Sequence, residues 1–255
     1  MRTMRTLTTT LIAGAAATAA ASAAADYRPL TLGSASVIAT GETELFGAAS
    51  YGAGQEARER GPIGESGDYD TFRLGPVGFR HGVFDAVEYG AYLSFVNNSE
   101  DDDGAPDESG LEGLTGFAKL ALNDHLALEV GTRMGGADDV APYPNDGIDF
   151  YVNFPMQRAV GDGLIYGELG YTIQDQDVGG TYTNWGLGYA HPLDNGTNLN
   201  IELAGDKNPV GDNHMDLLIG AGLQVEQVHL RPYVGLGLYD ASPDISVGVG
   251  ASLPL

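Results

Sequence analysis

The stretch Ile245–Leu255, ISVGVGASLPL, alternates strictly between apolar residues and small or polar ones. Every odd position holds Ile, Val, Ala or Leu, and every even position holds Ser, Gly or Pro. Successive side chains of a β-strand point to opposite faces, so the stretch predicts a strand with one apolar and one polar face. The same alternation recurs at 147–157, 199–203 and 217–225.

Following this pattern along the chain predicts twelve strands, with ten as the alternative count. The expected spans are 43–52, 70–81, 87–96, 111–122, 126–134, 147–159, 164–173, 181–191, 197–204, 213–225, 228–239 and 245–254. Their connections alternate between short turns, such as 123–125 and 226–227, and longer polar loops, such as 53–69 and 97–110. Short turns on one rim and long loops on the other are typical of bacterial outer-membrane barrels.

The predicted fold class is therefore all-β, an antiparallel up-and-down transmembrane β-barrel spanning residues 43–255. An even strand count places both ends of the barrel on one rim, as closure requires. The competing hypothesis is a soluble, lipocalin-like barrel, in which the apolar face would point inward.

The N-terminus has the features of an export signal. Arg2 and Arg5 precede an apolar, alanine-rich run, and the small residues at 21–25 fit a cleavage site. We expect a signal peptide at 1–25 and a periplasmic lead-in at 26–42. Residues 30–39 also look strand-like, but a thirteenth spanning strand would break the parity of the barrel.

Composition excludes several classes of function. The chain has no Cys, so disulfides, thiol catalysis and thiolate metal sites are excluded. Its 12 basic and 35 acidic residues give a formal charge of -23. Nucleic acid is not an expected partner, because phosphate binding needs clustered Lys and Arg. No segment after the signal is apolar over the roughly 20 residues that a membrane helix needs, so spanning strands are the remaining way to cross a bilayer.

Two phrases at the short turns carry a family resemblance. HGVFDAVEYG at 81–90 and LALNDHLALEVG at 120–131 each join a strand, an Asp-containing turn and an apolar-Glu-apolar-Gly strand. Together with the signal and the terminal strand, they resemble Gram-negative outer-membrane β-barrel proteins of the small-porin and phenol-degradation-pathway transporter class. The resemblance implies an outer-membrane barrel and names no substrate. The chain departs from such barrels in ending on Leu255 rather than on an aromatic residue.

If the apolar face meets lipid, the other face lines a lumen. On this parity the lumen-lining charged residues are Glu88, Lys119, Glu129, Arg133, Asp149, Glu168, Glu202, Asp216 and Arg231. Buried charges must be paired or hydrated, so the lumen is either a salt-bridged plug or a water-filled pore. Inward glycines such as Gly90, Gly131, Gly220 and Gly248 leave space, which favours water.

The sequence predicts a narrow porin-like channel for passive passage of small polar or cationic solutes, because acidic groups outnumber basic ones on the inner face. The alternative is a structural barrel with ligand- or partner-binding extracellular loops. No catalytic motif accompanies the histidines, and no cofactor is expected. A weak candidate for a divalent-cation site is the acidic loop containing Asp101, Asp103, Asp107 and Glu108, which we interpret as a solvated acidic loop. Lipid is the expected surrounding, and the sequence does not predict the oligomeric state.

Overall fold

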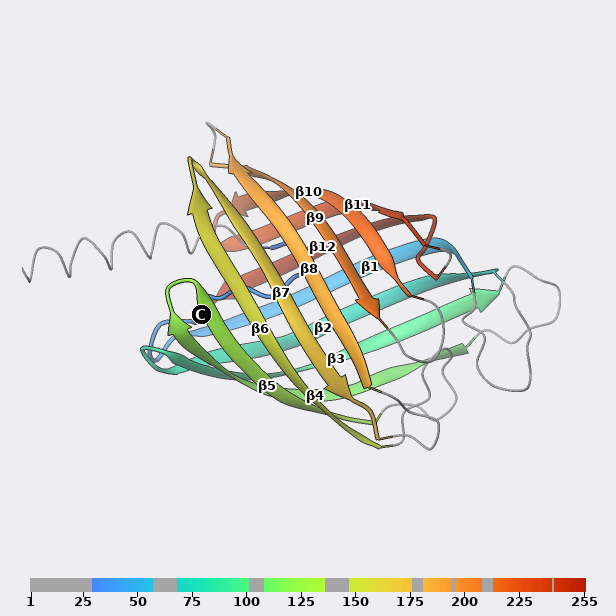
Figure 1. Cartoon of the computed structure of the whole chain (residues 1–255), viewed down its shortest axis with the longest axis horizontal. Helices are drawn as coiled ribbons and strands as arrows, with labels where there is room; N and C mark the ends of the chain where they lie inside the picture. The colour runs from blue at the N-terminus through green and yellow to red at the C-terminus, as the bar shows by residue number, and fades with distance from the viewer. Residues whose placement is uncertain are drawn as a thin grey trace, which may run out of the picture.

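The computed structural model describes residues 29–56, 68–100, 108–135, 147–175, 181–193, 196–207, 213–239 and 241–255. Twelve antiparallel strands follow one another in chain order around a closed barrel (Figure 1). They are β1 (Thr43–Glu56), β2 (Asp68–Phe84), β3 (Val87–Glu100), β4 (Glu108–Asn123), β5 (Leu126–Met134), β6 (Ile148–Val160), β7 (Gly163–Ile173), β8 (Thr181–Pro192), β9 (Asn198–Lys207), β10 (Met215–Val225), β11 (Val228–Gly237) and β12 (Ile245–Pro254). The ring closes where β1 pairs with β12, with Ala48 opposite Gly250.

The predicted fold class is confirmed, with twelve strands rather than the alternative ten. Each predicted span corresponds to a strand, but several strands run further toward the long loops. β1 continues to Glu56 and β3 to Glu100, both beyond the apolar alternation. Backbone pairing persists there, since Glu56 still lies opposite Asp68. The apolar pattern reports only the part of a strand whose outer face is apolar, so it underestimates the length of β1 and β3. The predictions for β10 and β11 err the other way, since β10 begins at Met215 and β11 ends at Gly237.

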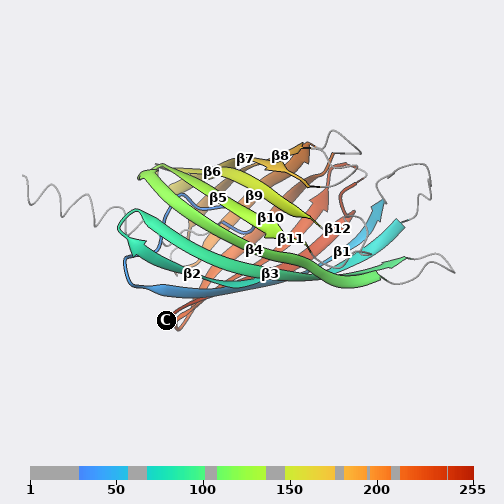
Figure 2. The ribbon, with the colours of Figure 1, turned by 90° about the horizontal axis from the view of Figure 1, so that it is seen from below.

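The strands run obliquely around the barrel, as Figure 2 shows from below. Closing a sheet on itself requires this tilt, because the register must shift by a fixed amount around the ring. No helix in the described ranges is long and apolar enough to span a membrane.

The wall has its apolar side chains outside and its polar side chains inside. Leu93, Ile219 and Val247 are exposed on the outer surface, as are large apolar residues from all the other strands. The buried residues include the charged side chains of Glu88 and Glu202, neither of which has any accessible surface. A soluble barrel needs the opposite arrangement, so the lipocalin-like alternative is wrong. An apolar band around the whole circumference is far larger than the patches that soluble monomers expose.

Irregularities in β1 to β4 change which residues face inward. The pairing of β2 with β3 shifts between Leu74 and Val77, around Gly75. Gly75 has a φ of 141°, and a Cβ there would lie 2.6 Å from the Cα of Ser94, so only glycine fits. Arg73 and Arg80 differ by seven in sequence number, which would place them on opposite faces of a regular strand. Because of this bulge, both face the lumen.

Candidate functional site: the lumen and its N-terminal belt

The structure places each sequence-predicted lumen residue on the inner face of its strand. They alternate with outward apolar residues, as Glu88 does with exposed Tyr89 on β3 and Glu202 with exposed Ile201 on β9. Eight strands contribute them: Glu88 (β3), Lys119 (β4), Glu129 and Arg133 (β5), Asp149 (β6), Glu168 (β7), Glu202 (β9), Asp216 (β10) and Arg231 (β11). The alternation of the wall thus brings charges from most of the ring onto one inner surface.

A segment before the first strand lies against this surface. We call residues 29–40 the N-terminal belt. The belt follows the inner wall from β2 to β11: Thr40 bridges Gly82, Ile38 contacts Glu88, Ser36 and Ser34 contact Gln157, Gly33 contacts Glu168, Leu32 lies over Gly186, Thr31 contacts Glu202, Leu30 lies over Gly220 and Pro29 contacts Arg231. We expected residues 26–42 to be a periplasmic lead-in, and that interpretation did not anticipate these contacts. The belt occupies the half of the lumen near the short turns.

Three glutamates hold the main chain of the belt. The Glu202 carboxylate accepts hydrogen bonds from the backbone N–H groups of Leu30 and Thr31, the latter at 3.0 Å, and from the Thr31 hydroxyl at 2.7 Å. Glu168 accepts the N–H of Gly33 at 2.6 Å. Glu88 accepts the N–H of Ile38 at 2.7 Å. These backbone groups have no strand partner, so the wall carboxylates satisfy them.

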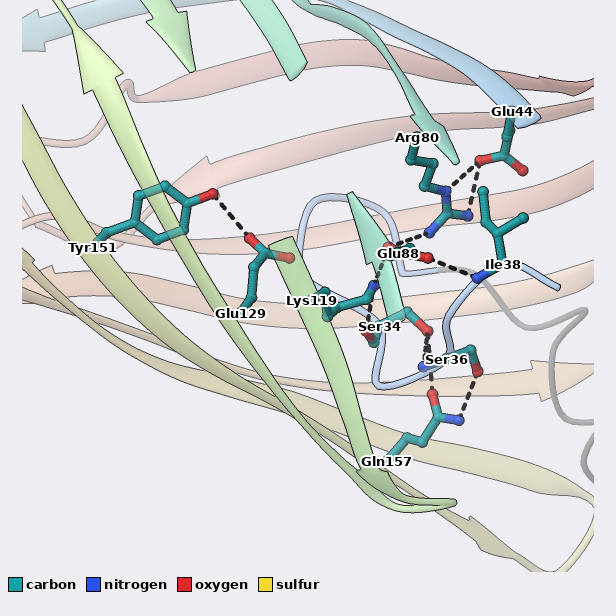
Figure 3. A network of polar contacts seen from close by, with 10 residues as sticks. All are labelled: Ser34, Ser36, Ile38, Glu44, Arg80, Glu88, Lys119, Glu129, Tyr151 and Gln157. Atoms are coloured by element: carbon teal, nitrogen blue, oxygen red, sulfur yellow. Dashed lines mark hydrogen bonds and ion pairs between the residues drawn. The ribbon is translucent and has the colours of Figure 1, made fainter. Parts of the chain in front are cut away.

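Glu88 is the centre of a charged network at the rim (Figure 3). Its carboxylate lies 2.8 Å from the Lys119 ammonium and 3.7 Å from the Arg80 guanidinium. Arg80 also pairs with Glu44 at 2.8 Å, and Lys119 donates to the carbonyl oxygen of Ser34 in the belt at 3.2 Å. The network therefore connects β1, β2, β3, β4 and the belt.

Glu168 and Glu202 differ from Glu88 in the nature of their partners. In the described residues, the remaining donors shown for Glu168 are the side-chain amides of Asn153 and Asn184, and Glu202 receives the Tyr166 hydroxyl at 2.8 Å. All of these donors are neutral. The middle of the belt therefore lies against negative charge that hydrogen bonds solvate without neutralising.

In the half of the lumen near the long loops, the ion pairs among the described residues join side chains of the wall to one another. Arg133 and Asp149 face each other across the β5–β6 ladder and pair at 2.6 Å, and Arg73 pairs with Glu112 at 2.8 Å. Further toward the short turns, Phe46, Tyr92 and Phe117 form edge-on and tilted ring contacts between β1, β3 and β4. Between the two halves, Glu129 accepts a hydrogen bond from Tyr151 at 3.1 Å.

The inward glycines do not leave open space, which corrects the interpretation made from the sequence. A Cβ on Gly220 would lie 2.8 Å from a methyl group of Leu30, and one on Gly131 would lie 2.5 Å from the Tyr151 ring. Other inward glycines accommodate side chains in the same way: Gly90 faces Phe117, Gly170 faces Asn184, Gly222 faces Asn198, Gly235 faces Ser246, Gly237 faces Ser242, Gly248 faces Tyr233 and Gly250 faces Arg231. These positions are small because neighbouring side chains and the belt fill them.

Sequence reasoning missed Arg80, Arg73 and the belt. The two arginines were missed because the Gly75 bulge inverts the parity of β2, which no apolar count reveals. The belt had a signal, the strand-like pattern at 30–39, but it forms a single bridge rather than a ladder. Its main-chain N–H groups bind Glu88, Glu168 and Glu202, which the alternation pattern predicts only as charged residues lining the lumen.

Asp101, Asp103 and Asp107 of the candidate cation loop lie outside the described residues, and Glu108 is described only as the first backbone position of β4. Among the described residues, no group of three or more His, Cys, Asp or Glu side chains is placed to hold a metal ion.

Solved structures support the architecture. The COG4313 outer membrane channel from Pseudomonas putida F1 matches with a TM-score of 0.62 at 16% identity, covering 90% of this chain and 100% of that one. The β domain of the Bordetella autotransporter BrkA matches with a TM-score of 0.58 at 12% identity, covering 82% of this chain and 98% of that one. The chain has the fold of outer-membrane β-barrels. At these identities the likeness shows the fold alone, and the two matched proteins are a channel and an autotransporter domain.

No protein-family model matches the sequence, and no curated protein matches it either. The function must therefore be inferred from the wall and the lumen of this chain.

Proposed function

We propose that the protein is an outer-membrane channel through which small polar or cationic solutes pass passively, without catalysis. The observation that carries the proposal is the composition of the inner wall. Carboxylates of Glu129, Glu168 and Glu202 face the lumen, and the hydrogen-bond donors shown for them in the described residues are neutral. An excess of lumenal negative charge favours cations over anions.

The proposed location follows from the outer face and the N-terminus. The apolar outer band suits a surrounding of outer-membrane lipid. Export would depend on the signal peptide at 1–25, which lies outside the described residues. The acidic loop at 101–108 would face the outside of the cell, where divalent cations could bind to its oxygen atoms.

A second candidate function is a structural barrel whose loops bind ligands or partners. The filled glycine positions favour this alternative, since protein atoms occupy space that a wide pore would leave to water. The N-terminal belt favours it as well, because the belt narrows the lumen near the short turns. The two candidates differ in whether ions cross the purified protein.

Conductance across a planar lipid bilayer, with the reversal potential measured in a salt gradient, separates the candidates. We expect stepwise openings with a preference for cations, and a weaker preference in Glu129→Gln. Glu129 is the suitable residue because it accepts its hydrogen bond from Tyr151 of the wall, whereas Glu168 also holds the belt. A bilayer that stays sealed at all voltages would favour the structural barrel. A preference for anions would support a channel but would show that these glutamates do not determine its ion selectivity.

A further inference from the structure

The N-terminal belt is attached in a way that allows it to leave the lumen in one piece. It shares no ladder with the wall, since its pairing with a strand is the single bridge between Thr40 and Gly82. Its other contacts include hydrogen bonds with wall side chains, and apolar contacts of Leu30 over Gly220 and of Leu32 over Gly186 and against the buried cluster of Leu164, Tyr166 and Ala190. Detachment therefore breaks this one bridge and none of the pairings among the twelve strands, so the barrel stays closed.

The wall beneath the belt would remain satisfied after detachment. Glu88 would keep Lys119 and Arg80 as charged partners. Glu168 would keep the amides of Asn153 and Asn184, and Glu202 would keep the hydroxyl of Tyr166. Water entering the vacated space would hydrate the oxygen atoms that had accepted the belt N–H groups. Departure thus leaves no charge both buried and unpaired, which is the outcome that costs most.

We propose that the N-terminal belt is a reversible constriction of the lumen, and that the carboxylates of Glu88, Glu168 and Glu202 are the latch that holds it. In the latched state the belt lines the inner wall from β2 to β11 and narrows the path near the short turns. In the released state the same path is wider and more acidic. The inference rests on the proposed channel function, because its consequence is two levels of conductance in one molecule.

A disulfide can lock the belt, since the chain contains no other Cys. The Cγ of Leu32, which lies about where the sulfur of a cysteine at this position would lie, is 3.1 Å from the position of a Cβ on Gly186, so cysteines at the two positions are close enough to test for a disulfide. The double variant Leu32→Cys/Gly186→Cys should show one constant low conductance when oxidised. Dithiothreitol should restore transitions between two levels. The control is Leu32→Cys alone, which cannot cross-link within the molecule and should not respond to dithiothreitol.

The latch is tested by neutralising its carboxylates. Glu168→Gln/Glu202→Gln should increase the fraction of time at the high level by at least tenfold. Glu112→Gln is the matched control, because this inward carboxylate is held by Arg73 in the other half of the lumen. An equal increase in both variants would overturn the latch, since it would show a general effect of lumenal charge.

Deletion of residues 29–40 separates failure of this inference from failure of the proposed function. The deletion should give a constant high level. If it conducts like the oxidised double-cysteine variant, the belt does not constrict the lumen and the inference is overturned. A deletion variant that runs as a folded barrel on an unheated gel and yet seals the bilayer would overturn the channel function itself. If the deletion variant does not fold, the double-cysteine variant still tests the inference. Transitions between two conductance levels that persist in the oxidised protein would contradict a moving belt.

Discussion

The two halves of the lumen satisfy their charges in different ways. Near the long loops, Arg133 and Asp149 are direct cross-strand neighbours and pair at 2.6 Å. Near the short turns, Glu168 and Glu202 bind N–H groups of the belt, which lies more than a hundred residues away in the chain. The first arrangement belongs to the wall itself. The second needs a separate segment to come in and occupy it.

This difference predicts which half is rigid and which can change. A cross-strand ion pair is held by the ladder and cannot separate without local unfolding of the sheet. The belt can lose its contacts while the sheet stays intact, since it contributes one bridge and no strand. The half near the long loops should therefore behave as part of the barrel, and the half near the short turns as a barrel with a bound peptide.

The largest effect is expected from breaking the ion pair near the long loops. Arg133→Met leaves the Asp149 carboxylate, which is 1% exposed, without its cation. Removing one partner of a buried pair typically costs about 3–5 kcal/mol of unfolding free energy. We expect a loss at the lower end of this range, because the Arg133 side chain is 27% exposed to solvent. The free energy of unfolding can be measured by urea titration in lipid vesicles, with the fluorescence of the single Trp, Trp185, as reporter.

The double variant Arg133→Met/Asp149→Leu is the control for this prediction. It removes both charges, so most of the lost stability should return. Equal losses of unfolding free energy in the single and double variants would show that the ion pair does not stabilise this half. The contrast between a rigid half and a changeable half would then not hold.

A smaller effect is expected on the outer face, which both halves share. Val247 and Ser246 are neighbours on β12 and point to opposite sides, with Val247 exposed and Ser246 half-buried. Arg at a lipid-facing site near the midplane costs about 2–4 kcal/mol, so Val247→Arg should destabilise the barrel in vesicles more than Ser246→Arg. Equal losses of folding free energy would contradict the outward assignment. The pair Ile219 and Gly220 is less suitable, because Leu30 already occupies the space at Gly220.

The sequence predicted the wall better than its contents, for a physical reason. Alternation with period two reports which residues face lipid, and it located the twelve strands and the inward side of Glu88, Lys119 and Glu202. It fails where a bulge changes the parity, as at Gly75 in β2, and where strands extend past the apolar band, as in β3. These errors are local and leave the barrel unchanged.

The contacts inside the lumen could not be predicted from alternation. Whether an inward glycine faces water or a side chain depends on neighbours from other strands, as Gly131 faces Tyr151 and Gly186 faces Leu32. The glutamates bind the belt chiefly through its main-chain N–H groups, which are the same for every residue type except Pro. A segment held in this way has little sequence signature, so its site could be recognised only once the glutamates were placed in space.

The smallest and most local effect is expected from a single latch residue. Glu202 has no accessible surface and accepts the backbone N–H groups of Leu30 and Thr31. In Glu202→Gln one oxygen becomes an NH₂ group that faces these donors, so at least one bond to a charged acceptor is lost. Such bonds contribute about 1.5–3 kcal/mol, so the amide hydrogens of Leu30 and Thr31 should exchange with solvent about 10 to 100 times faster.

The amides of Ile201 and Leu203 on the same strand should keep their protection, because the ladders of β9 with β8 and β10 are unchanged. Glu112→Gln is the control, since its carboxylate is held by Arg73 and the belt amides should not respond. Faster exchange along β9 as well would mean that the belt is part of the folded wall, and the distinction between the two halves would fail.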